Sequence, residues 1–508
     1  MKSMIPQILI LMNQKQPLYL SLTKKILFSS LLFISSFSLA QNLVEVEQIE
    51  DDKITTNVQD YLLLDSILTE EEYLAIVNKY HPVIKQANLT IEQGNSYLQK
   101  NRGGFDPKLF FDFKDKNYKE KNYYDLAHAG LKIPTWYGVE FKTGWEYSYG
   151  SYTNPESSTP LEGLGYAGIS VSLAQGLVMD KRRAELMKAK QYLQLSQNER
   201  DNIVNDLLRD AIYQYWEWSA AFAKYELLVE SLGNSQLRFK GIRESFYFGE
   251  LSVLDTLEAF TQIQLVHTGV LDAQADFAQQ TFQLNNFLWG QSAVPLIIEG
   301  LVPEEIVNKI NSVEFNDNYE VADSTIANHP LLRGYDAKLQ ALEIDRKLKA
   351  NKLLPKVNLQ YNLLSSNYQL NPNEYSTNNY KWGVNLSMPL LLRKERGDLK
   401  LTKIKIEQQQ LKMSLKQQEL LAKTKGYKVK TEALQAQNRI YASAVRGYKT
   451  LLQQEELKMK EGESSLFKLT LRDIKMLTSS IKLIELNLKL VKAKTAYIHS
   501  SGALYLLN

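Results

Sequence analysis

Apolar and polar residues alternate along several short stretches of the chain, which is the pattern of β-strands. In one stretch, Val357, Leu359 and Tyr361 are separated by Asn358 and Gln360. The same alternation occurs over residues 382–388 and 139–149. Each stretch predicts a strand with one apolar and one polar face. A soluble sheet packed on a core shows this alternation too, so the pattern alone leaves soluble and membrane sheets open.

Three further features favour a membrane sheet. The apolar faces are rich in Trp and Tyr, for example Trp145, Tyr147 and Trp382, as in the aromatic girdles of outer-membrane barrels. The stretches approach the roughly 9–11 residues that a tilted membrane strand needs. Polar segments of surface-loop type lie between them, over residues 152–160 and 371–379.

Long helices are predicted where proline is absent, roughly over residues 161–294 and 390–508, because proline breaks helices. Apolar residues there recur every four positions, as in Ile203, Leu207 and Ala211. The spacing predicts helices over about 182–245 and 398–461, each roughly 95 Å long at about 1.5 Å per residue. After Gly249 and Gly462, shorter helices over about 253–288 and 466–497 complete two long helical hairpins.

The chain contains the same module twice. His81-Pro82 recurs 248 residues later as His329-Pro330, and Pro107-Lys108 recurs at the same interval as Pro355-Lys356. Both hairpins turn at Gly-Glu-x-Ser. A repeat of this length is a doubled structural module. The predicted organisation is an N-terminal extension over 41–68, a first repeat over 69–288 (strands about 108–175, hairpin about 182–288), a linker over 289–324, and a second repeat over 325–508 (strands about 356–389, hairpin about 398–505).

The two copies differ in length between their strands. The interval between matching strands falls from 248 to 215 residues, so the first repeat carries about 33 extra residues around 116–150. Leu131, Ile133, Val139 and Phe141 make this insertion strand-forming, as an added hairpin, lengthened strands or an outer loop. With two strands per repeat, four strands from one chain leave bare edges, so closing a membrane barrel requires several chains.

The N-terminus predicts export. Lys24-Lys25 precede an apolar run over 26–39, and Ser38-Leu39-Ala40 supplies small residues for cleavage. Residues 1–40 are therefore predicted to be a signal peptide, with Gln41 as the first mature residue. The chain has no cysteine, so it is expected to have neither disulfides nor the lipidated cysteine of a lipoprotein.

Composition argues against nucleic-acid binding and catalysis. The net charge of +3 is close to balance, which gives no electrostatic footprint for nucleic acid. The five histidines show no metal-ligand spacing, and no phosphate loop or nucleophile motif is present. His81 and His329 precede proline at helix boundaries, where capping is the expected role. We therefore expect no enzyme activity, metal or cofactor.

The order of these elements resembles the TolC family of outer-membrane channel proteins. The resemblance rests on the doubled helix, strand pair and hairpin, on the helix ends at 78–82 and 328–330, on the strand-to-helix transitions at 177–184 and 390–393, and on the two Gly-Glu-x-Ser turns. It implies a mainly α fold with a membrane β-barrel part. Three chains would form a homotrimer with a twelve-stranded β-barrel in the outer membrane and an α-barrel across the periplasm.

The resemblance also implies a function. Such a protein is the passive outer-membrane channel of a tripartite transport system for the efflux of small molecules. It meets a periplasmic adaptor (membrane fusion) protein and an inner-membrane efflux pump or ABC exporter. The alternative is a periplasmic adaptor or a coiled-coil structural protein of the cell envelope. An adaptor, however, has one hairpin flanked by small β domains, whereas this chain predicts two hairpins that each follow strands.

The hairpin turns are the candidate site, because the resemblance places adaptor docking and the tunnel entrance there. Gly and Ser at these positions also fit a plain helix-helix turn with a capped second helix. Lys468 falls where some relatives place an aspartate, so it is the candidate entrance charge here, and the gate of those relatives is not assumed. The candidate tip residues are Phe248, Gly249, Glu250, Ser252, Leu254, Asp255, Gly462, Glu463, Ser465, Leu466 and Phe467.

Overall fold

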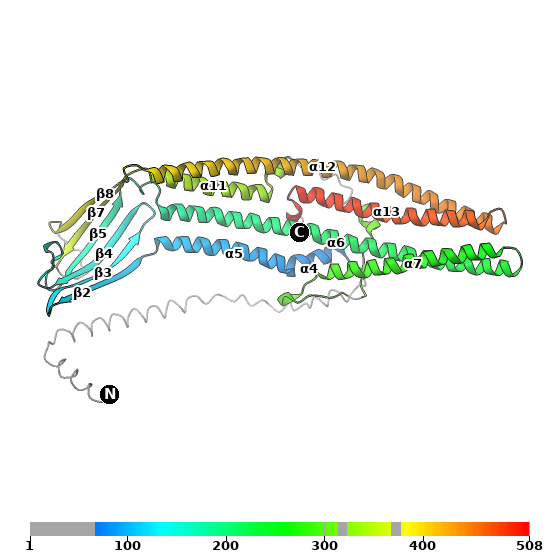
Figure 1. Cartoon of the computed structure of the whole chain (residues 1–508), viewed down its shortest axis with the longest axis horizontal. Coiled ribbons are helices and arrows are strands. Elements are labelled where there is room, and N and C mark those ends of the chain that lie inside the picture. The colour runs from blue at the N-terminus through cyan, green and yellow to red at the C-terminus, as the bar shows by residue number, and fades with distance from the viewer. Residues whose placement is uncertain (1–66, 299, 313–322, 367–376, 507–508) are drawn as a thin grey trace, which may run out of the picture. The chain divides into compact units, whose positions relative to one another are not determined.

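Two long helical hairpins and one antiparallel sheet make up most of the computed structural model (Figure 1). The structure describes residues 67–298, 300–312, 323–366 and 377–506. The predicted signal peptide and most of the extension that follows it lie outside these residues. Among the described residues, no helix is long and apolar enough to cross a membrane. The main helices are α4 (Glu70–Tyr80), α5 (Pro82–Arg102), α6 (Lys181–Tyr247), α7 (Val253–Asn285), α11 (Pro330–Asn351), α12 (Arg393–Lys460) and α13 (Leu466–Ser500).

The large sheet has six strands in the order β2-β3-β4-β5-β7-β8, all antiparallel. The expectation of four strands per chain is therefore wrong, and so is the twelve-strand barrel that three such chains would form. The second repeat supplies two strands as expected, whereas the first supplies four. Their bounds are β2 (Lys108–Tyr118), β3 (Lys121–Pro134), β4 (Val139–Tyr149), β5 (Leu164–Ser172), β7 (Lys356–Ser365) and β8 (Tyr380–Ser387).

The insertion in the first repeat is an added hairpin inside the sheet. Strands β3 and β4 lie between β2 and β5 and pair with both. The turn between them runs over residues 135–138, where Thr135 donates from its N and Oγ1 to the Val139 carbonyl at 2.9 and 2.7 Å. Of the three interpretations that the sequence left open, the hairpin is correct.

The long helices match the sequence prediction closely. Helix α6 has 67 residues and α12 has 68, which corresponds to about 100 Å each. Helix α7 packs along α6 and α13 along α12, while α5 and α11 pack against the halves of α6 and α12 nearer the sheet. Figure 1 shows the sheet beside the first turns of α6 and α12, with both hairpin turns at the other ends of these helices.

The predicted linker is tied to the middle of α6. Residues Val302–Pro303 form β6, which pairs in parallel with β1 (Ile67–Leu68), and Ile306–Asn311 form the short helix α8. Tyr215 and Trp216 on α6 are fully buried beside them. The Tyr215 hydroxyl donates to the Leu68 carbonyl at 2.7 Å, and Trp216 Nε1 donates to Glu70 at 3.0 Å. The linker therefore contributes to the core instead of lying free.

Both His-Pro pairs act as helix caps, as predicted. His81 is the N-cap of α5 and His329 the N-cap of α11, with proline at the first helical position. Nδ1 of His81 accepts from Val83 N at 3.2 Å, and Nδ1 of His329 accepts from Leu331 N at 3.0 Å. The capping box at Thr69 and Glu72 is also present. These helix caps can be predicted from the sequence because a cap involves residues only two or three positions apart.

Stability is expected to fall as the pH drops from about 6.5 to 4, because of His329. Burial, with the nearby His499 charge, lowers the His329 pKa from 6.5 to about 4. Within this window the unfolded chain binds a proton that the folded chain excludes, so the loss is about 1.4 kcal/mol per pH unit. The measurement is the thermal midpoint of wild type and His329→Asn at pH 7.0, 5.5 and 4.5. Asparagine caps without titrating, so the variant should lose less stability; parallel curves would contradict this assignment.

Candidate functional site

The first hairpin turn is a helix stop followed by a capped helix start. Gly249 has a φ of +79°, and its N–H and that of Glu250 bond to the carbonyls of Phe246 and Ser245 at 3.0 and 2.9 Å. This is a Schellman motif, whose left-handed position favours glycine. Ser252 and Asp255 then form a reciprocal capping box at the start of α7. Hydrogen bonds from Ser252 lower the pKa of the Asp255 carboxyl, so this side chain is a carboxylate near neutral pH.

The second hairpin turn repeats the stop but not the capping box. Gly462 has a φ of +76°, and Gly462 N and Glu463 N bond to the carbonyls of Met459 and Lys458 at 3.2 and 2.8 Å. Ser465 Oγ accepts from Lys468 N at 3.5 Å, yet lysine has no acceptor to return a bond. The exposed Lys468 ammonium thus occupies the position that Asp255 holds in the first turn.

A polar triad supports the second turn in place of the box. Ser464 Oγ donates to Glu455 Oε1 at 2.6 Å, and Arg472 Nε donates to Glu455 Oε2 at 3.5 Å. The Ser464 bond, followed by Arg472, lowers the pKa of Glu455. Residues on both helices of this hairpin are therefore linked through one carboxylate, close to the turn.

Leu466 differs from the other predicted tip residues, because it is only 5% exposed. It packs with Ile242 and Ala259 of the first hairpin, beside Phe239, Leu251 and Met459. This cluster joins the two hairpins just behind their turns, so Leu466 is a packing residue and not part of the accessible surface. A second contact between the hairpins is the ion pair of Arg238 and Asp473 at 2.9 Å.

Part of the accessible surface of the tips is apolar. Phe248 is 82% exposed, and Leu254 and Phe467 are also exposed. The same surface includes Tyr247, Val253 and Leu257, which are also exposed. The sequence did not identify these three residues, because their spacing is that of ordinary apolar positions of α6 and α7. Exposed apolar residues gathered at a loop mark interaction sites more often than isolated ones do. We define the tip surface as Tyr247, Phe248, Val253, Leu254, Leu257 and Phe467.

The outer face of the sheet is a second apolar surface. Register pairs place Leu109 beside Leu131, Trp145 beside Ala129, and Trp382 beside Tyr361. Exposed apolar side chains therefore run across all six strands, as on the lipid side of a membrane barrel. They include Leu109, Phe111, Phe113, Phe141, Ile169, Tyr361, Trp382, Val384 and Leu386.

The other face of the sheet is polar and is filled locally by two aromatic rings. Tyr166 is 5% exposed, and its hydroxyl lies 2.9 Å from His128 Nε2. A Cβ on Gly144 would meet the Tyr166 hydroxyl, and one on Gly130 would meet both Phe110 and Tyr166. The added hairpin therefore has glycine at the positions covered by the Phe110 ring of β2 and the Tyr166 ring of β5. The absence of a side chain there gives these rings room to lie over the hairpin.

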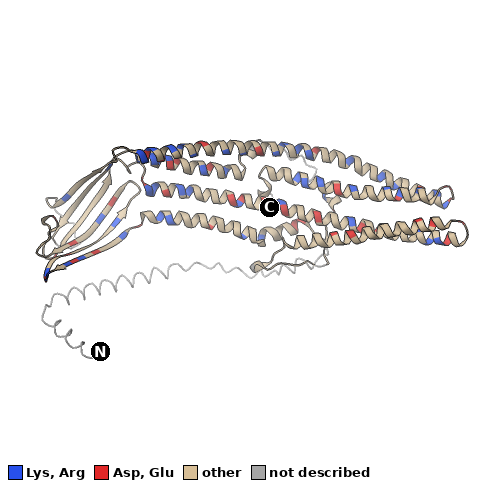
Figure 2. Cartoon of the chain, viewed as in Figure 1, with Lys and Arg blue, Asp and Glu red and all other residues tan. Residues whose placement is uncertain are grey.

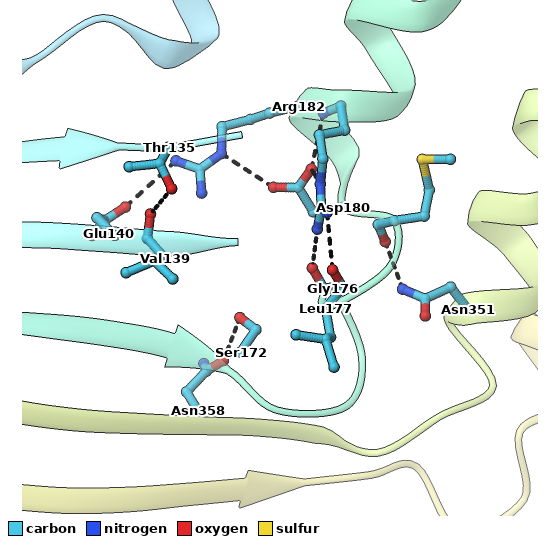
Figure 3. A network of polar contacts seen from close by, with 12 residues as sticks. Thr135, Val139, Glu140, Ser172, Gly176, Leu177, Asp180, Arg182, Asn351 and Asn358 are labelled. Atoms are coloured by element: carbon cyan, nitrogen blue, oxygen red, sulfur yellow. Dashed lines mark hydrogen bonds and ion pairs between the residues drawn. The ribbon is translucent and has the colours of Figure 1, made fainter. Parts of the chain in front are cut away.

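A polar network joins the sheet to helix α6 (Figure 3). Asp180 caps α6 by accepting from Arg183 N at 2.9 Å. The Arg183 guanidinium is 8% exposed and pairs with Asp180 at 3.0 Å, and it also donates to the carbonyls of Leu177, at 2.9 Å, and of Gly176. Arg182 reaches Glu140 of the added hairpin at 3.4 Å. The network fixes the angle at which strand becomes helix.

The chain is similar to known proteins both in part of its sequence and in its fold. Residues 321–502, which cover most of the second repeat, match the family model of outer membrane efflux proteins. Over these residues the chain is similar to outer membrane efflux proteins. No curated protein sequence matches it. Members of this efflux family are passive channels and not enzymes, and they lie in the outer membrane.

Solved structures agree on the fold of the whole described chain. It is similar to the CmeC outer membrane channel of Campylobacter jejuni, with a TM-score of 0.57 and 85% of each chain covered. It is also similar to the VceC outer membrane protein of Vibrio cholerae (TM-score 0.58, 85% and 95% covered) and to the open state of the MtrE outer membrane channel of Neisseria gonorrhoeae (0.59, 85% and 88%). Identity is 12% in each case, so this likeness shows the TolC-like fold alone.

Proposed function

We propose that this protein is the outer-membrane channel of a tripartite transport system, a passive trimeric conduit for the efflux of small molecules. Exported by its signal peptide and carrying no lipid anchor, it would be held in the membrane by its sheet. One observation carries the proposal. The sheet at one end of α6 and α12 has an apolar outer face, and the tip surface at the other end of these helices is apolar and exposed. The first surface suits lipid and the second suits a protein partner.

Three copies would close a barrel of eighteen strands, six from each chain. Strands β2 and β8 are the two edges of the sheet, and bare edges are not tolerated in lipid. With an even number of antiparallel strands per copy, β8 of one copy can pair antiparallel with β2 of the next. The apolar side chains of both edges then lie on the same face, as lipid contact requires.

Cysteine cross-linking tests this closure cleanly, because the chain has no cysteine of its own. Val384→Cys in β8 is combined in turn with Leu109→Cys, Phe111→Cys or Phe113→Cys in β2, all on the outer face. At least one pair is expected to give disulfide-linked oligomers on non-reducing gels. The control, Val384→Cys with Phe110→Cys, places the thiols on opposite faces and should give none. Absence of cross-links from every outer-face pair would refute the closed barrel.

Adaptor docking is proposed for the tip surface, with Gly249 and Gly462 shaping its two turns and Glu250, Ser252, Glu463 and Ser465 lining them. The exposed rings of Phe248 and Phe467 supply apolar area to bury, and aromatic anchors dominate many protein interfaces. The inner-membrane pump or exporter would act through that adaptor. Membrane fractionation and native mass spectrometry test the whole proposal: a trimer in the outer membrane supports it, and a soluble periplasmic monomer contradicts it.

A further inference from the structure

Four lysines lie on the polar face of the sheet at the end that meets the helices. Lys108 and Lys356 are the first residues of β2 and β7, and they are the lysines of the repeated Pro-Lys pairs. Lys132 lies two residues before the end of β3, and Lys142 three residues after the start of β4. We call Lys108, Lys132, Lys142 and Lys356 the lysine belt.

Register places three members of the belt side by side. Lys108 is paired with Lys132, and Lys132 with Lys142, across neighbouring antiparallel strands. Directly opposed residues have Cβ atoms about 4.5–5.5 Å apart, and like charges there are destabilising. Lys132 Nζ lies 4.3 Å from the centre of the Phe110 ring, which fixes it on the polar face. The pairing opposes stability, so a functional reason for it is expected.

Acidic partners in this region do not neutralise the belt. In the four residues of each strand nearest the helices, the only carboxylate on the polar face of the described strands is Glu140. It lies 3.7 Å from Lys142 but is shared with Arg182 at 3.4 Å. Among the described residues, Lys108 and Lys132 form no ion pair with a carboxylate. The end of the sheet therefore carries a net positive charge.

The helices beside the belt extend the positive charge. Figure 2 shows Lys and Arg gathered where α6 and α12 begin next to the sheet. Helix α12 opens with Arg393, Lys394 and Arg396, with one glutamate among them. Rings of lysine or arginine are a known way to favour anions in a pore, because charge in a narrow low-dielectric channel concentrates counter-ions.

We propose that the lysine belt lines the passage at the inner mouth of the β-barrel and makes this channel select anions, so that its cargo is anionic small molecules. The inference rests on the proposed channel function, in which the polar face lines the lumen. In a closed barrel β8 alone separates Lys356 from Lys108 of the next copy, so the belt continues around the pore. A carboxylate- or phosphate-bearing solute would meet it on leaving the helical tunnel.

The test is the reversal potential of the purified full-length trimer in planar lipid bilayers under a KCl gradient. Wild type is expected to pass chloride better than potassium, with the preference weakening near 1 M salt as charges are screened. The combined variant Lys108→Gln, Lys132→Gln, Lys142→Gln and Lys356→Gln should lower the chloride-to-potassium permeability ratio by roughly threefold or more, since a potential of several kT changes local ion concentrations by such factors.

A charge-conserving control separates charge from side-chain identity. The same four positions changed to arginine should keep the wild-type reversal potential. Heat-resistant trimer migration on gels checks that each variant is assembled. A cation-selective wild type, or an unchanged chloride-to-potassium permeability ratio in the glutamine variant, would refute the role of the lysine belt. Either result would leave the proposed channel function standing. Absence of any conductance in wild type would instead overturn the channel function, and the belt with it.

Discussion

Leucine at both Gly249 and Gly462 is expected to reduce transport to the level of a strain that lacks the protein, while trimers remain in the outer membrane. Both glycines have a left-handed φ, which costs a residue with a Cβ about 1–2 kcal/mol. Apart from adjacent residues of the chain, no atom lies within 4 Å of the point that a Cβ would occupy at either position. The added side chain therefore meets solvent and not the core. The leucine therefore changes the proposed docking surface more than the fold.

Two matched variants separate backbone strain from bulk. Asparagine at the same two positions tolerates the left-handed conformation and should keep most of the transport. Gly241→Leu lies on α6, the helix that ends just before Gly249. It also has open space around it, but it lies in ordinary helical backbone and away from the turn. It should transport normally. Efflux of a fluorescent substrate and recovery of heat-resistant trimers are the two measurements. Normal transport in the leucine double variant would refute docking at the turns.

The two hairpins of one chain are held together by contacts away from the turn glycines. The cluster around Ile242, Ala259 and Leu466 lies behind the turns. The ion pair of Arg238 with the buried Asp473 is further along the hairpins. Burial raises the pKa of Asp473 in spite of the neighbouring guanidinium, so this pair costs desolvation and depends on the surrounding packing. Neither contact includes a glycine of the turns.

The sequence predicted the helices better than the sheet, for a physical reason. Proline-free length and four-residue spacing place α6 within about two residues of its observed ends, because those signals depend on neighbours along the chain. Strands β3 and β4 were harder to count. On β3 the outer face carries Ala127 and Ala129 and the polar face carries Gly130, so apolar and polar positions contrast weakly. The sequence alone therefore detected strand-forming residues without fixing how many strands they make.

The site divides in a similar way. The turn residues can be predicted from the sequence, because a Schellman glycine and a capping serine bond to backbone groups only a few positions away. The burial of Leu466 cannot be predicted in this way, since its partner Ile242 lies on the other hairpin. Tyr166 over Gly130 and Gly144 is likewise a contact between strands. Contacts set by tertiary packing leave no periodic signal, so single-sequence reasoning assigned Leu466 to the accessible surface.

Replacing Arg183 with methionine is expected to destabilise the trimer by about 3 kcal/mol or more per chain. The buried guanidinium satisfies the Gly176 and Leu177 carbonyls and pairs with Asp180. Methionine fills similar volume but leaves these acceptors without a donor, and it leaves Asp180 with Arg182, at 3.3 Å, as its remaining ion-pair partner. Removing one member of a buried pair costs about 3–5 kcal/mol, because the other charge remains desolvated. Denaturant unfolding of the detergent-solubilised trimer, with trimer retention on gels after heating, measures the loss.

The neighbouring arginine is the matched control for this prediction. Arg182 is 36% exposed at its side chain and pairs with Glu140 at 3.4 Å and with Asp180 at 3.3 Å. Because it is partly exposed and Asp180 keeps Arg183, Arg182→Met should cost about 1 kcal/mol or less. Arg183→Lys should fall between the two, because an ammonium keeps the charge but lacks the planar fork that reaches two carbonyls and a carboxylate together. Equal stability of the Arg183→Met and Arg182→Met variants would show that the junction does not depend on the buried guanidinium. The expected order instead makes Arg183 the residue that holds strand β5 and helix α6 at their angle, and with it the alignment of the sheet and the long helices.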